Sequence, residues 1–334
     1  MASGNIQLED IAKELGLSTS TVSRAISGKG HLSEATRNKV KDCVEKYGYY
    51  PNANARSLAK SKTNNICVII PTEAFLYITP YYQVCLMGII QQTAKHNYNA
   101  LVTTVSENDN SYLKRVIATQ LVDGVILTRS MTNDETLLYL RNNQIPFVII
   151  GSQEDKTIPQ VDGNHIKASR ELTKTLLDKS ASVAILLGGT NYMVNENRYK
   201  GYAEAYKDKG ITLDSNIVYT NLIAPEQIEK AIDNLYTYNV KTVICGDDNL
   251  CMQALNHLAK RGISIPWQIK VASLYDSPLL SNRTPPITAV EIDDRKLGAL
   301  AAETLINLIE GNETSESNKT PDYQIHYRLS TELI

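Results

Sequence analysis

The sequence of 334 residues predicts a small helical head followed by an α/β body of parallel sheets flanked by helices. Two patterns lead to this prediction. In residues 1–62, apolar residues recur at the three- and four-residue spacing of amphipathic helices. From residue 66 onward, short apolar runs typical of buried strands alternate with helical stripes. Because such alternation implies right-handed crossovers, the strands are expected to run parallel.

Three helices are expected in the head, from apolar stripes within 8–15, 21–26 and 40–47. Ser18 and Ser33 stand where the second and third of these helices would begin. A serine hydroxyl at that position can accept a hydrogen bond from a free backbone N–H, so both residues are expected to cap their helices.

Residues 52–59 predict a fourth, short helix, and the polar run at 61–65 predicts a domain boundary. Eight strand-like runs follow in the body, at 66–70, 100–105, 124–127, 147–150, 183–187, 242–245, 270–273 and 287–290. Eight strands exceed the usual size of a single sheet, so we expect two consecutive α/β subdomains.

The composition limits the class of protein. Hydrophobic residues make up 43% of the chain, which is ample for a buried core, and no apolar run approaches the ~18–20 residues that span a bilayer. The first residues lack the pattern of a secretory signal, and the five cysteines are odd in number, scattered and without any CxxC pair. We therefore expect a cytoplasmic protein with reduced thiols, no metal site and no cofactor.

Charge is divided unevenly along the chain. Residues 1–62 hold ten Lys and Arg against six Asp and Glu, whereas the rest of the chain holds 24 against 30. A basic head on an acidic body is typical of a chain that meets phosphate at one end. An enzyme is not expected, because the five histidines form no HExxH motif, Gly188-Gly189 lacks the rest of a phosphate-binding loop, and no serine lies in a GxSxG motif.

The head meets the requirements of a two-helix DNA reader, which needs a tight turn, a small core and a second helix that begins with base-contacting residues. Gly16 permits the turn. Thr19 and Ser20 project from the start of the second helix, with Arg24 one turn later. Hydroxyl groups donate and accept hydrogen bonds, and arginine can grip guanine through two parallel bonds. The apolar spacing alone would suit a plain helical hairpin equally well.

The string IQLEDIAKELGLSTSTVSRAISG at 6–28 resembles the opening of the lactose repressor/galactose repressor (LacI/GalR) family of bacterial transcription regulators. The family pattern is met by Asp10-Ile11-Ala12, Gly16-Leu17-Ser18 and Thr21-Val22-Ser23-Arg24, whereas Gln7 and Leu15 depart from it. The run at 50–59 resembles the family's hinge helix, and the resemblance continues to about residue 332.

By position, the resemblance implies major-groove contacts by Thr19, Ser20 and Arg24, phosphate contacts by Ser23 and Asn52, and minor-groove contacts by Ala55 and Leu58. An apolar side chain such as Leu58 can unstack a base step and bend the duplex, although a linker residue covering a domain junction is the alternative. Because a helix of about eight residues is unstable alone in water, we expect 52–59 to become ordered on DNA, paired with its copy from a second subunit.

The resemblance also implies a periplasmic-binding-protein-like body of two lobes. The expected domains are a helix-turn-helix at 1–50, a hinge helix and linker at 51–62, and a ligand-binding and dimerisation domain at 63–334. Within the last domain, lobe one would cover about 63–161 and 293–322, and lobe two about 162–292 and 323–334.

Ligands in such folds sit near the carboxyl ends of parallel strands, where loops converge. Seven residues are expected to bind one: Tyr81, Tyr82, Thr128, Arg129, Arg198, Asp247 and Asp276. The arginines offer rigid forks of donors and the aspartates accept from hydroxyls, whereas the tyrosines can stack on a sugar ring. Each also has a structural alternative: a surface salt bridge for Arg198, a helix cap for Asp247, strand-end solvation for the pair at 128–129, and loop stiffening for the tyrosines. At Asp276 the chain departs from the family pattern, because Ser273-Leu274-Tyr275 precedes it where many relatives carry a glycine.

These features predict a transcription regulator that binds palindromic double-stranded DNA as a homodimer. The family resemblance implies that it represses carbohydrate-utilisation genes. Its effector would be a mono- or oligosaccharide held between the lobes. The alternatives are a family regulator controlled by a phosphocarrier protein or by a non-sugar ligand and, more distantly, a solute-binding protein.

Overall fold

The computed structural model describes residues 6–28, 30–49, 62–72, 80–106, 109–312 and 320–332. The chain divides into two compact units, Met1–Thr63 and Asn64–Ile334. The expected minor-groove and phosphate contacts Asn52, Ala55 and Leu58 lie outside the described residues.

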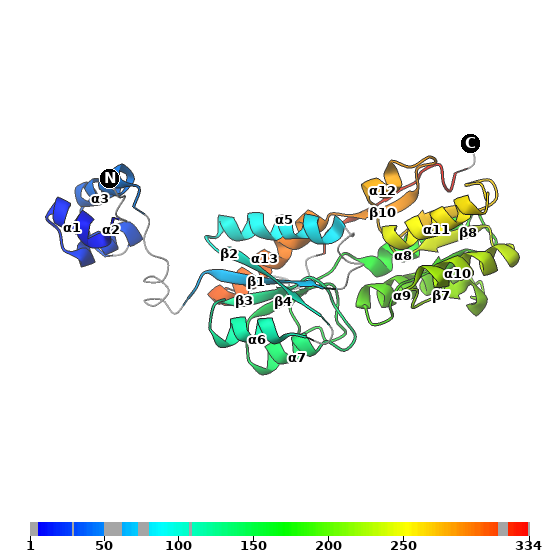
Figure 1. Cartoon of the computed structure of the whole chain (residues 1–334), viewed down its shortest axis with the longest axis horizontal. Helices are drawn as coiled ribbons and strands as arrows, with labels where there is room; N and C mark the ends of the chain where they lie inside the picture. Colours follow the sequence, from blue (N-terminus) through cyan, green and yellow to red (C-terminus); the bar gives the residue numbers. More distant parts are fainter. Residues whose placement is uncertain are drawn as a thin grey trace. The chain divides into compact units, whose positions relative to one another are not determined.

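In the described part of the head, three helices form: α1 (Leu8–Leu15), α2 (Thr19–Ser27) and α3 (Glu34–Tyr47) (Figure 1). The predicted caps are confirmed, because Ser18 Oγ accepts from the Thr21 N–H and Ser33 Oγ accepts from the Thr36 N–H, each over 3.2 Å. Gly16 ends α1 at a φ of 63°, in the left-handed region that glycine enters without strain. The small buried core consists of Ile11, Ala12, Val22, Val40 and Cys43.

Lobe one of the second unit contains a parallel sheet in the order β2-β1-β3-β4-β5. Its strands are β1 (Asn65–Pro71), β2 (Asn99–Val105), β3 (Gly124–Leu127), β4 (Phe147–Ile150) and β5 (Gln160–Val161). Ile66 and Val68 pack on the side of α5 (Pro80–Lys95) and α13 (Asp294–Glu310). Cys67 and Ile69 pack on the opposite side, against α6 (Ser111–Ala118) and α7 (Glu135–Asn142). Successive residues of the strand therefore point to opposite sides, and helices cover both faces of the sheet.

Helix α13 follows lobe two in the chain but packs in lobe one, against α5 and the sheet (Figure 1). Two glycines permit the close approach of α5 and α13. A Cβ at Gly88 would lie 2.0 Å from the Arg295 carbonyl oxygen, and a Cβ at Gly298 would lie 2.1 Å from the Cys85 carbonyl oxygen. Because no side chain fits at either contact, the packing of α13 in lobe one depends on these glycines.

Lobe two contains a second sheet in the order β11-β10-β9-β8-β6-β7. Its strands are β6 (Ala184–Leu186), β7 (Val218–Tyr219), β8 (Thr242–Cys245), β9 (Lys270–Ser273), β10 (Thr288–Ile292) and β11 (Tyr323–His326). Its helices are α8 (His165–Leu177), α9 (Met193–Asp208), α10 (Pro225–Thr237), α11 (Asp248–Lys260) and α12 (Pro278–Ser281). All eight predicted runs form strands. The sequence patterns missed β5 and β7, because two residues are too few to show a period, and the edge strand β11 runs antiparallel to β10.

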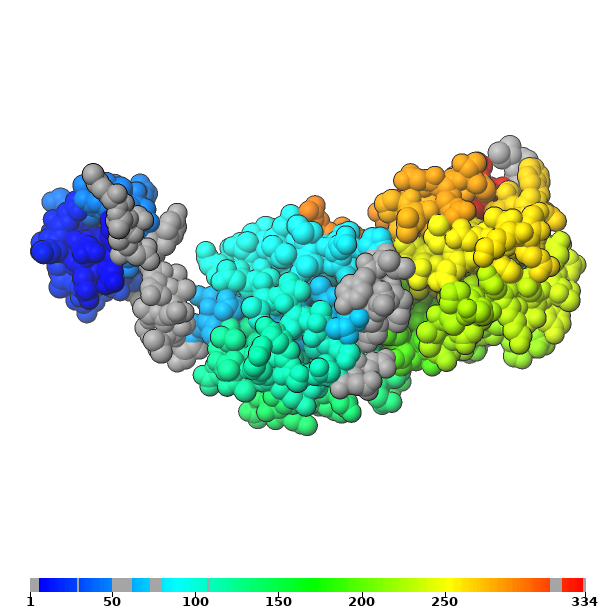
Figure 2. All heavy atoms as spheres, viewed as in Figure 1, coloured from blue at the N-terminus to red at the C-terminus, as the bar shows by residue number. Residues whose placement is uncertain are grey.

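The two lobes touch directly. The Met193 N–H donates to the Ser130 carbonyl oxygen over 3.1 Å, and the Thr132 N–H donates to the Asn191 carbonyl oxygen over 3.0 Å. Figure 2 shows the cyan-to-green surface of lobe one meeting the green-to-orange surface of lobe two. The chain crosses between the lobes from β5 to α8 and again from β10 to α13. The strand ends of lobe one therefore face those of lobe two across the junction.

Candidate functional site

The exposed face of α2 is the candidate DNA-contacting surface of the head. Thr19, Ser20, Ser23 and Arg24 are all exposed, and their spacing places them on one side of the helix, whereas Val22 points into the core. The helix begins directly after its cap, so its first turn is available to a groove. The structure thus brings these four predicted DNA contacts together on one surface.

Arg37 on α3 holds the turn that follows α2. Its guanidinium donates to the carbonyl oxygens of Gly28 (3.2 Å) and Gly30 (2.9 Å). These carbonyls would otherwise be left free at the end of α2. The bonds therefore tie α2 to α3, and they were not predicted because they join residues seven and nine positions apart through a side chain.

A cleft of about 680 Å³ opens between the two lobes. Residues that follow strands β2, β3, β4, β5, β6, β7, β8 and β9 line it, together with the N-terminal turns of α5, α8, α9, α11 and α13. Six of the seven predicted ligand residues are among them: Tyr81, Tyr82, Thr128, Arg129, Arg198 and Asp247. The volume lies within the range of about 300–1,000 Å³ usual for small-molecule sites.

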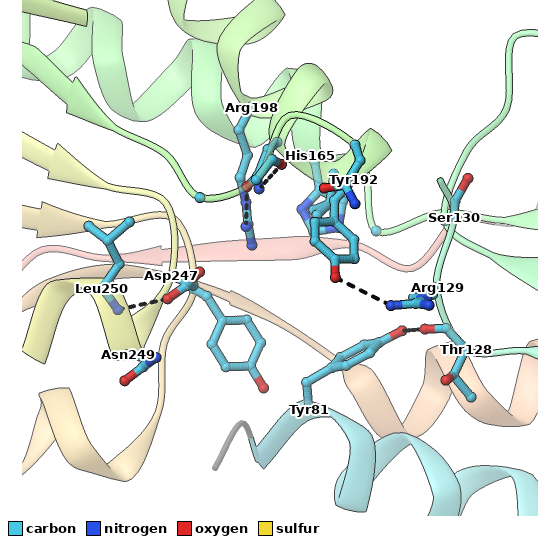
Figure 3. Close-up of a pocket in the computed structure, with 18 of the residues that line it drawn as sticks. Tyr81, Thr128, Arg129, Ser130, His165, Tyr192, Arg198, Asp247, Asn249 and Leu250 are labelled. Atoms are coloured by element: carbon cyan, nitrogen blue, oxygen red, sulfur yellow. Dashed lines mark hydrogen bonds between the residues drawn. The ribbon is translucent and has the colours of Figure 1, made fainter. Parts of the chain in front are cut away.

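Arg198 of α9 is the most unusual group in the cleft. It is 6% exposed, and among the described residues no carboxylate lies within ion-pairing distance of its guanidinium. One terminal nitrogen reaches Asn195 Oδ1 at 3.4 Å, and Nε has no partner within the described part of the chain. Burial lowers the pKa of Arg198, whereas the charges of Asp247 and Asp248 raise it. A surface salt bridge is therefore not its role here, and a donor remains free beside the cleft (Figure 3).

Three carboxylates line the cleft around this arginine. Asp247 caps α11 by accepting from the Leu250 N–H (2.8 Å), and it still borders the cleft. Asp162 Oδ1 is buried without a partner among the described residues, and burial raises the pKa of this carboxyl. Asp294 is 7% exposed and accepts from the Tyr275 hydroxyl (2.6 Å). Burial raises the pKa of Asp294 to about 7, against the effect of the Tyr275 hydrogen bond.

The lobe-one side of the cleft is built from tyrosines and the loop after β3. The Tyr81 hydroxyl donates to the Thr128 carbonyl oxygen (3.0 Å), and its ring meets that of Tyr82 edge to face, with centroids 4.8 Å apart. Arg129 donates to the Tyr192 hydroxyl of lobe two over 3.3 Å, as Figure 3 shows. The Thr128 hydroxyl donates to a strand carbonyl. Tyr81 and Thr128 thus hold the loop, and Arg129 links the lobes across the cleft mouth.

Asp276 is not among the residues that line the cleft. Its carboxylate forms a two-point ion pair with Arg328, whose Nη1 lies 2.9 Å from Oδ1. The charge is therefore used inside lobe two, and the preceding Tyr275 faces the cleft instead. The expectation for Asp276 is corrected accordingly. The position of the strand end was right, but the sequence could not show which of two adjacent side chains turns inward.

The sequence did not predict several other residues that line the cleft: Asp162, His165, Tyr192, Asn195, Asn221, Asn249, Gln253, Tyr275 and Asp294. Asp162 directly follows β5 and Asn221 lies two residues after β7, and neither of these two-residue strands shows a sequence pattern. Asp294 was not detectable, because α13 reaches the cleft from a distant part of the chain. Burial lowers the pKa of His165 to about 3, with help from the Arg198 charge, so its ring is neutral at pH 7.

A helix-turn-helix head and a two-lobed body, with a cleft that several charged side chains line, define a class: DNA-binding regulators that respond to a small molecule. The head residues 7–52 match the family model for "Bacterial regulatory proteins, lacI family", and residues 174–331 match that of a "Periplasmic binding protein-like domain". The transcriptional regulator MalR of Staphylococcus xylosus is 32% identical over 98% of this chain and 99% of its own length. RegA of Clostridium saccharobutylicum is 28% identical over 97% and 98%. The chain belongs to the LacI family and is a DNA-binding transcription regulator.

Solved structures agree on the fold. The lac repressor dimer bound to operator and an anti-inducer superposes with a TM-score of 0.81 at 19% identity, covering 98% of this chain and 99% of that one. A complex of the regulator CelR with cellobiose superposes with a TM-score of 0.75 at 24% identity, covering 97% and 99%. Among the described residues, no helix is long and apolar enough to cross a membrane, and no cluster of three or more His, Cys, Asp or Glu suits a metal ion.

Proposed function

We propose that this regulator represses carbohydrate-utilisation genes in the cytoplasm and that a small sugar in the interlobe cleft controls its affinity for operator DNA. The observation that carries the proposal is the buried, unpaired Nε of Arg198 beside the carboxylates of Asp162, Asp247 and Asp294. Sugar hydroxyls both donate and accept, so they match such a mixed set of donors and acceptors. No catalytic step is assigned to these groups.

The relatives support a carbohydrate effector. MalR of Staphylococcus xylosus is 32% identical, and a structure described as a probable maltose operon repressor is 25% identical with a TM-score of 0.74 over 81% of this chain and 99% of that one. The solved cellobiose complex of CelR indicates that this fold accommodates a disaccharide. We therefore infer that mono- and disaccharides are the compounds to test first.

Control of DNA affinity follows from the position of the cleft. A ligand that contacts both lobes stabilises the lobe arrangement that it fits, and it shifts the protein between arrangements only by its difference in affinity for them. The lobe contacts made by Arg129 with Tyr192 and by Ser130 with Met193 would change when the lobes move. We propose that two subunits share this motion and present their heads to the half-sites of a palindrome, with Thr19, Ser20 and Arg24 on bases and Ser23 and Asn52 on phosphate.

The test is a gel-shift titration of the full chain against palindromic and scrambled duplexes, with and without a panel of sugars. Arg24→Ala should remove the preference for the palindrome, whereas the control Lys41→Ala, which removes an equal charge from α3, should retain it. Arg198→Ala should remove the response to sugar and leave operator binding intact, whereas Arg141→Ala, on the surface of α7, should leave both unchanged.

Absence of any palindrome preference in the wild-type chain would contradict the proposal for DNA. An operator affinity that no free sugar alters would contradict sugar control and would favour the alternative in which a phosphocarrier protein regulates this chain.

A further inference from the structure

We infer that the cleft selects uncharged sugars and excludes their phosphorylated forms. This inference rests on the proposed function, because it names the charge class of the effector that the cleft takes. Its basis is that other groups of the protein already occupy the helix N-termini and the two arginines of the cleft.

Helix N-termini are the usual protein sites for phosphate, because free backbone N–H groups and the helix dipole favour negative charge there. Three of the helices that begin at this cleft already have an aspartate at that end. Asp247 accepts from the Leu250 N–H of α11, and Asp293 accepts from the Lys296 N–H of α13 over 2.9 Å. Asp162 lies just before α8, where burial raises the pKa of its carboxyl and the nearby backbone N–H groups of Gly163 and Asn164 oppose that rise.

Besides α5, whose first turn contributes Tyr81 and Tyr82, α9 is the fourth helix that begins at the cleft, and its first turn also offers little to an anion. The Met193 N–H donates to the Ser130 carbonyl oxygen of the other lobe, and Glu196 lies in the same turn. A phosphate at any of these four ends would meet a carboxylate or would have to displace a contact between the lobes.

The two arginines of the cleft do not offset the negative charge of these carboxylates. Burial lowers the pKa of Arg198, and the charges of Asp247, Asp248 and Asp294 oppose that effect. Arg129 bonds to the Tyr192 hydroxyl, and its charge partly offsets the burial that raises the pKa of the Asp134 carboxyl. An added phosphate dianion would therefore lie close to several carboxylates without a cation whose charge is free to receive it.

Hydroxyl groups, by contrast, suit the buried unpartnered atoms of the described cleft, which are Arg198 Nε, Asp162 Oδ1 and Gln253 Oε1. Arg198 Nε is a buried donor without an acceptor, and Asp162 Oδ1 is a buried acceptor without a donor. A sugar hydroxyl can accept from the first and another can donate to the second, which relieves the cost of leaving such atoms unpaired. An ionised phosphate oxygen can only accept, so it leaves Asp162 unsatisfied and repels it.

The experiment measures binding of matched pairs to the full chain by isothermal titration calorimetry in phosphate-free buffer. The pairs are glucose, maltose, cellobiose and trehalose, each with its 6-phosphate. We expect at least one uncharged sugar to bind, to lose binding in Arg198→Ala, and to bind about 100-fold more tightly than its phosphorylated partner. Asp162→Asn should reduce the ratio of the two affinities, uncharged to phosphorylated, at least tenfold, whereas the surface control Asp178→Asn should leave this ratio unchanged.

A phosphorylated sugar that binds as tightly as its uncharged partner, and that also depends on Arg198, would overturn the inference and leave sugar control of the regulator intact. A ratio that Asp162→Asn does not change would refute the assignment of selectivity to the cleft acids. If neither form of any sugar binds, the proposed function fails and this inference fails with it.

Discussion

Replacing Asp294 with asparagine should change how the stability of this regulator depends on pH. Asp294 is buried at the start of α13, accepts from the Tyr275 hydroxyl and lies near the charges of Asp293, Asp248 and Arg198. Burial raises the pKa of its carboxyl from the ordinary 3.8 to about 7. Asparagine keeps an oxygen that accepts from Tyr275 but carries no charge at any pH, so the variant isolates the effect of ionisation.

The sign follows from proton binding. Between pH 3.8 and about 7 the folded chain keeps this proton while the unfolded chain has lost it, so the wild-type free energy of unfolding falls as the pH rises through that window. Each pH unit within the window is worth about 1.4 kcal/mol, which gives about 2.5 kcal/mol between pH 5 and pH 8. Asp294→Asn lacks this loss. Its stability relative to wild type should therefore grow by about 2.5 kcal/mol over the same interval.

The assay is urea unfolding at pH 5, 6, 7 and 8, followed by circular dichroism and by the fluorescence of Trp267, the only tryptophan of the chain, which lies in the body and not in the head. Asp178→Asn, an exposed carboxylate at the end of α8, is the matched control and should run parallel to wild type. A difference between Asp294→Asn and wild type that is the same at pH 5 and pH 8 would show that Asp294 is already ionised below neutrality, and the reasoning from burial would be refuted.

Three further variants test the packing of the body, the head and the expected hinge. Gly88→Ala places a Cβ 2.0 Å from a backbone oxygen of α13, so it should lower the free energy of unfolding by about 3 kcal/mol or more in urea, whereas Gln83→Ala on the exposed side of α5 should not. Ser18→Ala removes the cap of α2 and should cost the head about 1 kcal/mol, seen as faster amide hydrogen exchange in α2 of the full chain; unchanged exchange would contradict the cap. Leu58→Ala should reduce operator bending and specific affinity while sugar binding stays normal. An undiminished bend in a circular-permutation assay would contradict the insertion of Leu58 between base pairs.

The three helices of the head show how much of the structure local sequence can predict. Ser18, Ser33 and Gly16 act on backbone groups within a few residues of themselves, so their caps and turn could be predicted from spacing alone. The same holds for the eight strands predicted from apolar runs, because a continuous run of four or five apolar residues indicates a strand that is buried on both faces. The candidate ligand residues at strand ends, such as Asp247, followed from a general property of parallel sheets, whereas Arg198 of α9 followed from the family resemblance; both border the cleft.

The sequence by itself therefore determined the helices, the strands and the loops from which a site would be built, since these depend on short-range hydrogen bonds and on burial period. Only the tertiary structure decided which side chains meet. It brought Asp294 to Tyr275 by seating α13 against α5 through Gly88, and it paired Asp276 with Arg328 instead of leaving it to the cleft. The physical reason is that the choice of an ionic or hydrogen-bonding partner depends on close approach between segments far apart in the chain, which no local pattern records.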